Sequence, residues 1–380
     1  MKDTEKKLIG IVTISEASLL ALTLFAFLTI VFLPYLIVVI LFAKICLSLL
    51  ANSLLFVYIL FANLDKRIKA VISTGIVLGI ITISPCMIVA AIMMNKAVGE
   101  TNPSIDGKFK LLFENKECEK CGTSYDIVEP VCPKCKTRNK DVKKYKINQT
   151  ISWLPFWKQI GFFAIGFLGL NIFSIFVTIF LPLVVDPESI TYVMLNNTIC
   201  YFTVFIAMLL FLISGYRQTF KSFKKWLPYI VGIAGGIFLI IFSISYNLIT
   251  HIFIESGTNA NQSAANDLMK TYPLISLILI GIIGPIVEEF TYRLGLFSFL
   301  RRINVWVAYL VTIAFFTFIH FSFDASNLLQ EFISLPNYIM AGFVLCLLYD
   351  KLGFAASITA HITNNFIAAV FTILATLLTK

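Results

Sequence analysis

The stretch "LISLILIGIIGPIVEEFTYRLGLFSFL" (residues 274–300) combines a long apolar run with three charged side chains. A helix that crosses a bilayer needs about 20 mainly apolar residues, and this stretch exceeds that length. Glu288, Glu289 and Arg293 interrupt it. Each charge near the middle of a membrane helix costs roughly 2.5–3.5 kcal/mol on an insertion scale, and such residues usually mark a function. The stretch therefore predicts a membrane helix that carries a functional site.

The composition indicates that the rest of the chain is also membrane sequence. Of its 380 residues, 58% are hydrophobic and only 13% are charged, and the mean hydropathy is +0.88. Soluble domains are nearer half apolar and a quarter charged. We therefore predict an all-α polytopic membrane protein, surrounded by the lipid bilayer. The net charge of +9 does not indicate a nucleic-acid partner, because much of it lies in one polar insert and at the ends of predicted spans.

The hydrophobic segments predict about ten transmembrane helices. The N-terminal domain, residues 1–95, contains about three of them. A polar insert follows at residues 96–152, and a core of seven helices at residues 153–380 completes the chain. The seven core segments are predicted at 158–185, 197–216, 228–249, 273–300, 303–321, 334–349 and 354–378.

Basic loops predict the topology of a multi-pass protein in the cell membrane. The segment "RQTFKSFKKW" (217–226) and the pair Arg301–Arg302 are typical of cytoplasmic ends. The insert then also falls on the cytoplasmic side. Three spans before a cytoplasmic insert would place residue 1 outside, together with the basic "NLDKRIK" (63–69). The topology of the first spans therefore stays open.

The insert holds "CEKCGTSYDIVEPVCPKC" (118–135), in which Cys118, Cys121, Cys132 and Cys135 form two CxxC pairs. Two such turns supply four thiolates to one tetrahedral metal, which leaves no open position. The spacing predicts a structural zinc site, and the sequence resembles a zinc ribbon. The alternative is two disulfides, which would need an oxidising compartment. The partner of the ribbon is not indicated, and its lysines are more typical of a solvated face than of nucleic-acid binding.

Helical geometry separates the two glutamates. Glu289 and Arg293 are four residues apart and share a face, so they can pair and reduce the cost of burial. Glu288 points roughly 100° away from Glu289. It is therefore the carboxylate expected to face a cavity, and Pro285 is expected to loosen the helix beside it.

Two further helices each present polar side chains within apolar sequence. His320 ends "FFTFIHF", and His361 lies four residues before Asn365 in "ITAHITNNF", so that these two share a face. Two chemistries suit the set. In one, Glu288 and His320 activate water while His361 and Asn365 stabilise an oxyanion. In the other, Glu288, His320 and His361 bind a catalytic zinc ion.

Three stretches, "PIVEEFTYRLGLFSFL", "FFTFIHF" and "YDKLGFAASITAHITNNF", resemble the ordered motifs EExxxR, FxxxH and HxxxN/B of the CAAX protease and bacteriocin-processing family of intramembrane glutamic endopeptidases. The resemblance covers about residues 280–370. It implies a metal-free mechanism in which Glu288 and His320 activate water and His361 and Asn365 form the oxyanion hole, with Glu289 and Arg293 completing the first motif. Leu294 stands where the family usually has a glycine, and Gly295 follows it.

The resemblance implies an endopeptidase that acts on a membrane-bound peptide or protein. Neither the substrate nor whether it is prenylated follows from it. Two other hypotheses are a non-proteolytic binding, immunity or scaffold protein of the same fold, and a membrane-anchored zinc-ribbon adaptor. Retention of all four catalytic-type residues argues against the first, and the number of polar residues inside the helices argues against the second.

Overall fold

The computed structural model describes residues 112–253, 257–323 and 327–378. The three predicted N-terminal spans and the first part of the predicted insert lie outside the described residues. Residues 115–142 and 146–380 form one compact unit. This unit contains the cysteine cluster and all the motifs.

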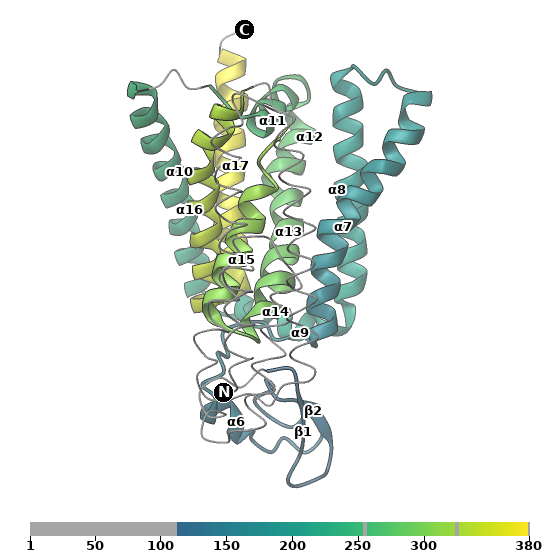
Figure 1. Ribbon diagram of the computed structural model, residues 1–380, viewed down its shortest axis with the longest axis vertical. Coiled ribbons are helices and arrows are strands. Elements are labelled where there is room, and N and C mark those ends of the chain that lie inside the picture. The colour runs from purple at the N-terminus through teal and green to yellow at the C-terminus, as the bar shows by residue number, and fades with distance from the viewer. Residues whose placement is uncertain (1–111, 254–256, 324–326, 379–380) are drawn as a thin grey trace, which may run out of the picture. The chain divides into compact units, whose positions relative to one another are not determined.

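Six of the described helices, or unbroken runs of helical turns, are long and apolar enough to cross a membrane. The chain is therefore an all-α polytopic membrane protein, as predicted from its composition. The helices that build the core are α7 (Phe156–Phe180), α8 (Ile190–Leu212), α10 (Leu227–Phe253), α16 (Leu328–Leu352) and α17 (Phe354–Leu378), together with the run Pro273–Arg301. Figure 1 shows this run between α7 and α8 on one side and α10, α16 and α17 on the other.

The run Pro273–Arg301, called here the motif helix, contains two π-helical stretches between α-helical segments. Its parts are α12 (Pro273–Ile278), a π turn (Leu279–Ile283), α13 (Gly284–Glu289), a second π stretch (Phe290–Phe297) and α14 (Ser298–Arg301). In the first π turn the N–H of Gly284 bonds the carbonyl of Leu279, five residues back, directly before Pro285, which has no N–H. Such π segments are frequent at functional sites.

The second π stretch explains the displaced glycine of the first motif. A π turn holds more residues than an α turn, so the side chains after Arg293 are rotated relative to an α-helix. Gly295 faces α7, where an added Cβ would lie 2.7 Å from the backbone nitrogen of Phe163. Only glycine allows this approach of two backbones. The small residue is thus needed at position 295, and Leu294 is fully buried beside it.

The segment predicted as a full span at 303–321 is shorter than expected. The helix α15 (Val305–Phe318) has 14 residues, which rise about 21 Å at 1.5 Å per residue. The hydrocarbon core is about 30 Å thick. The helix therefore ends inside the predicted span, just before His320. As a result, the His320 imidazole lies at the level of the cavity described below.

Two short strands and two cysteine turns make up the ribbon. Strands β1 (Asn115–Glu117) and β2 (Ser124–Asp126) pair antiparallel, and the short α6 (Lys140–Lys144) follows. In each cysteine turn the residue after the second cysteine, Gly122 or Lys136, has a positive φ and donates its N–H to the carbonyl of the first cysteine. The two turns are therefore built alike.

The ribbon packs against the basic end of the motif helix. The buried guanidinium of Arg302 donates to both carboxylate oxygens of Asp126, at 3.2 and 2.9 Å. It also bonds Gln159 Oε1 at 2.7 Å. A second contact joins Asn148 to the carbonyl and carboxylate of Asp350 at the end of α16. The ribbon is therefore anchored to the same helices that carry the motifs.

Candidate active site and metal centre

The two glutamates of the motif helix have different surroundings. Glu289 and Arg293 are completely buried, and Arg293 Nε lies 3.4 Å from Glu289 Oε2. The guanidinium also stands 4.9 Å from the centre of the Phe316 ring. Among the described residues its three nitrogens have no hydrogen-bond partner, so the ion pair and the cation–π contact are what compensate the buried charge.

His361 of α17 lies between both carboxylates. Its Nδ1 is 3.0 Å from Glu289 Oε1, and its Nε2 is 3.7 Å from Glu288 Oε2. The first distance is a hydrogen bond and the second is an ion-pair distance without one. Because an ionised carboxylate only accepts hydrogen bonds, Nδ1 must carry the proton toward Glu289. The buried acid thereby fixes the orientation of the ring.

Glu288 is the more accessible of the two acids, with 13% of its side chain exposed. Its Oε2 has no hydrogen-bond partner among the described residues. It does not itself belong to the cavity wall, where His361 stands. The expectation that Glu288 itself faces the cavity is therefore not confirmed. The wall residue beside it is His361, whose Nε2 lies 3.7 Å from the Glu288 carboxylate.

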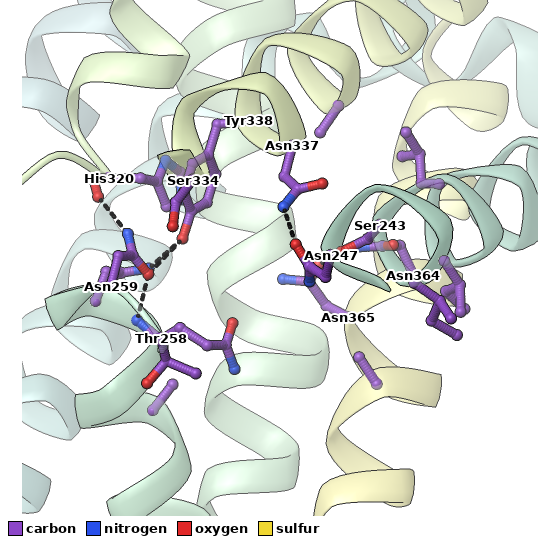
Figure 2. Close-up of a pocket in the computed structure, with 18 of the residues that line it drawn as sticks. Ser243, Asn247, Thr258, Asn259, His320, Ser334, Asn337, Tyr338, Asn364 and Asn365 are labelled. Atoms are coloured by element: carbon purple, nitrogen blue, oxygen red, sulfur yellow. Dashed lines mark hydrogen bonds between the residues drawn. The ribbon is translucent and has the colours of Figure 1, made fainter. Parts of the chain in front are cut away.

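His320 is held by a set of contacts that the motif alone does not reveal. Its Nδ1 is 2.8 Å from the carbonyl of Phe316, so this nitrogen carries the proton and Nε2 is left as an acceptor. The ring of Tyr338, on α16, stacks on it with centroids 4.5 Å apart. Asn259, at the start of α11 (Ala260–Thr271), donates to the carbonyl of His320 and accepts from the Tyr338 hydroxyl. Figure 2 shows this arrangement.

Both histidines and Asn365 line one cavity of about 880 Å³. The Phe316 ring connects the two imidazoles, with centroids 5.1 Å from His320 and 5.8 Å from His361. Asn365 Nδ2 donates to the carbonyl of Ile280 at 3.4 Å, and the second hydrogen of that amide is available to another acceptor. The structure thus brings together side chains from three separate segments of the sequence.

The cavity occupies the half of the helical core away from the ribbon. On α10 its lining residues run from Leu239 to His251, in the second half of the helix, and on α17 from His361 to Thr372, in the middle of the helix. Both α10 and α17 begin near the linker that follows the ribbon. There Lys221 donates to the carbonyls of Gln149 and Ile151. Residues of α11 also line the cavity, and Figure 1 shows α11 at the end of the helical core opposite β1 and β2.

Sequence reasoning missed Tyr338, Asn259 and the amides that line the cavity. Tyr338 and Asn337 follow Pro336 inside an apolar helix, and polar residues in a membrane helix mark a site by default. That signal was available for α16. The hydrogen-bond partner of Asn337 could not be predicted, because it lies on a helix far away in the sequence.

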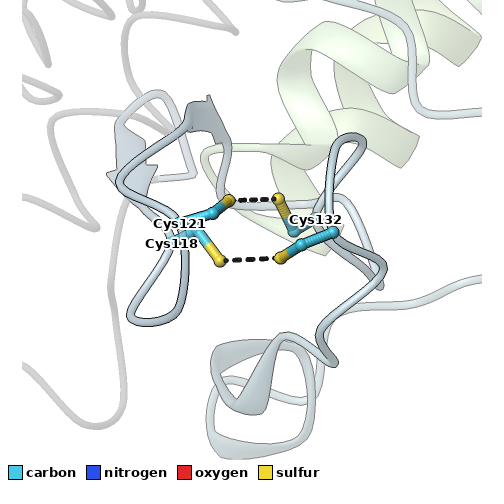
Figure 3. Close-up of side chains that lie close together, drawn as sticks. Cys118, Cys121 and Cys132 are labelled. Atoms are coloured by element: carbon cyan, nitrogen blue, oxygen red, sulfur yellow. Dashed lines mark hydrogen bonds between the residues drawn. The ribbon is translucent and has the colours of Figure 1, made fainter.

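The four cysteines of the ribbon form a candidate metal centre (Figure 3). All four Sγ atoms lie within 4.8 Å of one another. Cys118 Sγ is 3.4 Å from Cys135 Sγ, and Cys121 Sγ is 3.7 Å from Cys132 Sγ. A tetrahedral site with Zn–S distances of about 2.3 Å holds its sulfurs about 3.8 Å apart. The cysteines are free thiols, not the two disulfides of the alternative, and they could hold a metal ion.

The threonines that follow each cysteine pair prepare the thiols for a metal. The hydroxyl and backbone N–H of Thr137 lower the pKa of the Cys135 thiol to about 6. Thr123 lowers the pKa of Cys121 in the same way. Because the thiolate is the metal ligand, these hydrogen bonds favour the binding form near neutral pH.

The fold and the site define a polytopic membrane protein with a buried cluster of acids and imidazoles beside a polar cavity. Residues 270–367 match the family model described as "Type II CAAX prenyl endopeptidase Rce1-like". This segment contains all three motifs, so the resemblance drawn from them is confirmed: over these residues the chain is similar to that family.

Two curated relatives come from Lactococcus lactis. "UPF0177 protein YvdC", from subsp. lactis (strain IL1403), is 26% identical over 181 residues, which cover 46% of this chain and 66% of that protein. "UPF0177 protein in abiGi 5'region", from subsp. cremoris, is 32% identical over 106 residues, which cover 28% of this chain and 44% of that protein. The matches thus span just under two thirds and under half of the lengths of these relatives. No solved structure gives a significant match.

Proposed function

We propose that the protein is an intramembrane endopeptidase that hydrolyses a peptide bond in a membrane-bound peptide or protein. The observation that carries the proposal is the position of His361, which lies 3.0 and 3.7 Å from two carboxylates at the wall of a cavity that also contains His320. The match to the Rce1-like family over residues 270–367 supports it. Binding alone gives no reason for such a cluster in apolar sequence.

In this proposal Glu288 is the general base. Its Oε2 has no hydrogen-bond partner among the described residues and its side chain is partly exposed, so it can accept a proton from a water molecule. His320 holds the same water through Nε2, because Nδ1 is engaged by the Phe316 carbonyl. The water attacks the peptide carbonyl, and the proton taken by Glu288 passes to the leaving amine.

His361 and Asn365 form the oxyanion hole in the same proposal. Asn365 offers its second amide hydrogen. His361 already donates through Nδ1 to Glu289, so it must carry both protons to donate through Nε2 as well. The adjacent carboxylates balance the charge of that ring. Hydrogen bonds that are arranged before the reaction stabilise the oxyanion without reorganisation at that step.

The metal-dependent alternative is less compatible with the geometry. Among the described residues, the four ribbon cysteines are the one group of three or more possible metal ligands whose ligand atoms all lie within 4.8 Å of one another. Glu288, His320 and His361 do not form such a set. We therefore assign the reaction a metal-independent glutamic mechanism.

We further propose that the metal of the ribbon is a structural zinc ion. Purified protein is expected to contain about one zinc per chain, because four thiolates complete its tetrahedral shell. The variant Cys118→Ser/Cys121→Ser should lose this zinc, whereas Cys200→Ser, which changes a buried cysteine of α8, should keep it. Elemental analysis measures both. Zinc that persists in the double variant and disappears with His361→Ala would instead support a metalloprotease.

The ribbon is proposed to lie in the cytoplasm, so the cavity would open on the opposite side of the membrane. A cysteine at Asn261, an exposed residue of the cavity wall, should then react with a membrane-impermeant maleimide in intact cells. A cysteine at Lys224, in the basic loop before α10, should react only after permeabilisation. The reverse pattern would place the ribbon outside.

A further inference from the structure

The cavity wall has a composition that the catalytic proposal does not use. Of the described residues that line it, none is Asp, Glu, Lys or Arg. Its polar groups are carboxamides, hydroxyls and imidazoles. Asn247 of α10, Asn337 of α16 and Asn364 of α17 each contribute an amide from a different helix. Figure 2 shows these amides facing the same space.

The amides are only partly paired with one another. Asn337 Nδ2 donates to Asn247 Oδ1 at 3.0 Å, while Asn337 Oδ1 is buried and has no hydrogen-bond partner among the described residues. Asn364 Nδ2 donates to Asn365 Oδ1 at 2.9 Å. A buried acceptor without a partner destabilises the protein, and a bound group that supplies an N–H removes this cost.

The dimensions of the cavity fit a short extended chain. Its lining residues on α17 run from His361 to Thr372, a helical rise of about 16 Å. An extended peptide advances 3.3–3.6 Å per residue, so about five residues cover that distance. A volume of about 880 Å³ lies within the range of roughly 300–1,000 Å³ in which proteins bind small ligands.

We infer that the cavity binds its substrate as an extended peptide segment without charged side chains, whose backbone is paired by the carboxamides of Asn247, Asn337 and Asn364. Each peptide unit offers one donor and one acceptor, and a carboxamide side chain complements both. A charged side chain would meet no Asp, Glu, Lys or Arg on the described wall, and any charge on His361 is already balanced by Glu288 and Glu289. The cost of leaving the charge unpaired therefore excludes it. This inference rests on the proposed endopeptidase function, since it assigns the substrate of that site.

The test uses the full-length Glu288→Gln protein in lipid nanodiscs, which prevents turnover. Three pools of octapeptides with a neutral dye are compared by fluorescence polarisation: one built only from uncharged residues, one with a central Lys and one with a central Asp. The neutral pool is expected to bind at least about tenfold more tightly than either charged pool. Equal binding of the pools, or no binding of the neutral pool, overturns the inference.

Variants connect this preference to the amides. Asn337→Leu is expected to weaken binding of the neutral pool several-fold, and Asn171→Leu, which removes an exposed amide of α7 outside the cavity, to leave it unchanged. Asn337→Asp places a carboxylate in the wall and should reverse the order of the neutral and Lys pools. An unchanged order in a folded Asn337→Asp protein contradicts the assignment.

The failure of this inference and that of the protease proposal give different results. Cleavage of the peptide pools by the protein with Glu288 intact is measured in parallel by mass spectrometry. Selective binding without Glu288-dependent cleavage supports the peptide site and rejects the protease. Glu288-dependent cleavage of all three pools at equal rates supports the protease and rejects an uncharged substrate.

Discussion

Replacement of Glu288 by Gln is expected to reduce peptide cleavage by about a thousandfold or more. Removal of a general base typically costs 10²–10⁴-fold, and the carboxamide of Gln cannot take a proton from water. The position of the side chain should not change, because Glu288 Oε2 forms no hydrogen bond among the described residues. Cleavage of the uncharged peptide pool by purified protein in nanodiscs, followed by mass spectrometry, measures the effect.

His320→Ala should fall to a similar level, because in the proposed mechanism Glu288 and His320 hold the same water. Glu188→Gln, which changes an exposed carboxylate in the loop before α8, is the matched control and should keep full activity. Cleavage at the wild-type rate in both Glu288→Gln and His320→Ala would remove the protease proposal and favour a binding or scaffold protein.

Replacement of Glu289 by Ala is expected to destabilise the fold by about 3–5 kcal/mol, the usual cost of removing one partner of a buried ion pair. Glu289 and Arg293 are both completely buried, so among the described residues the variant leaves the guanidinium with the Phe316 ring as its partner. Denaturant unfolding in detergent micelles measures the free energy of unfolding. Activity should also fall, because His361 loses the carboxylate that orients its ring.

The double variant Glu289→Ala/Arg293→Leu separates the charge from the packing. It should recover much of the stability, since the unpaired charge is gone and a similar apolar volume remains, but not the activity. A Glu289→Ala protein within about 1 kcal/mol of the wild type would contradict the role of this pair.

The sequence predicted those features whose signal is local. The two CxxC pairs stand 11 residues apart, from Cys121 to Cys132, and their spacing is sufficient to predict a metal centre. The pairing geometry of Glu289 and Arg293 follows from helical periodicity. The seven apolar segments of the core follow from hydropathy, because the bilayer imposes a length on each span.

The remaining features depend on contacts between distant segments. The early end of α15 at Phe318 has no proline or glycine to mark it, and the structure ties His320 to Asn259 and Tyr338 instead. The contact of Arg302 with Asp126 joins the core to the insert, whereas sequence reasoning used Arg302 only as a topology signal. Hydropathy does not say which faces of two membrane helices meet, so Asn247 and Asn337 could not be paired in advance.

The central claim is that the acid and imidazole cluster hydrolyses peptide bonds within the membrane. Its most direct test compares the newly formed peptide termini in membranes of cells that carry the wild-type protein, Glu288→Gln or Glu188→Gln. We predict that a defined set of membrane peptides is cleaved in the wild type and in Glu188→Gln and accumulates uncleaved in Glu288→Gln. Identical sets of termini in all three strains would contradict the claim.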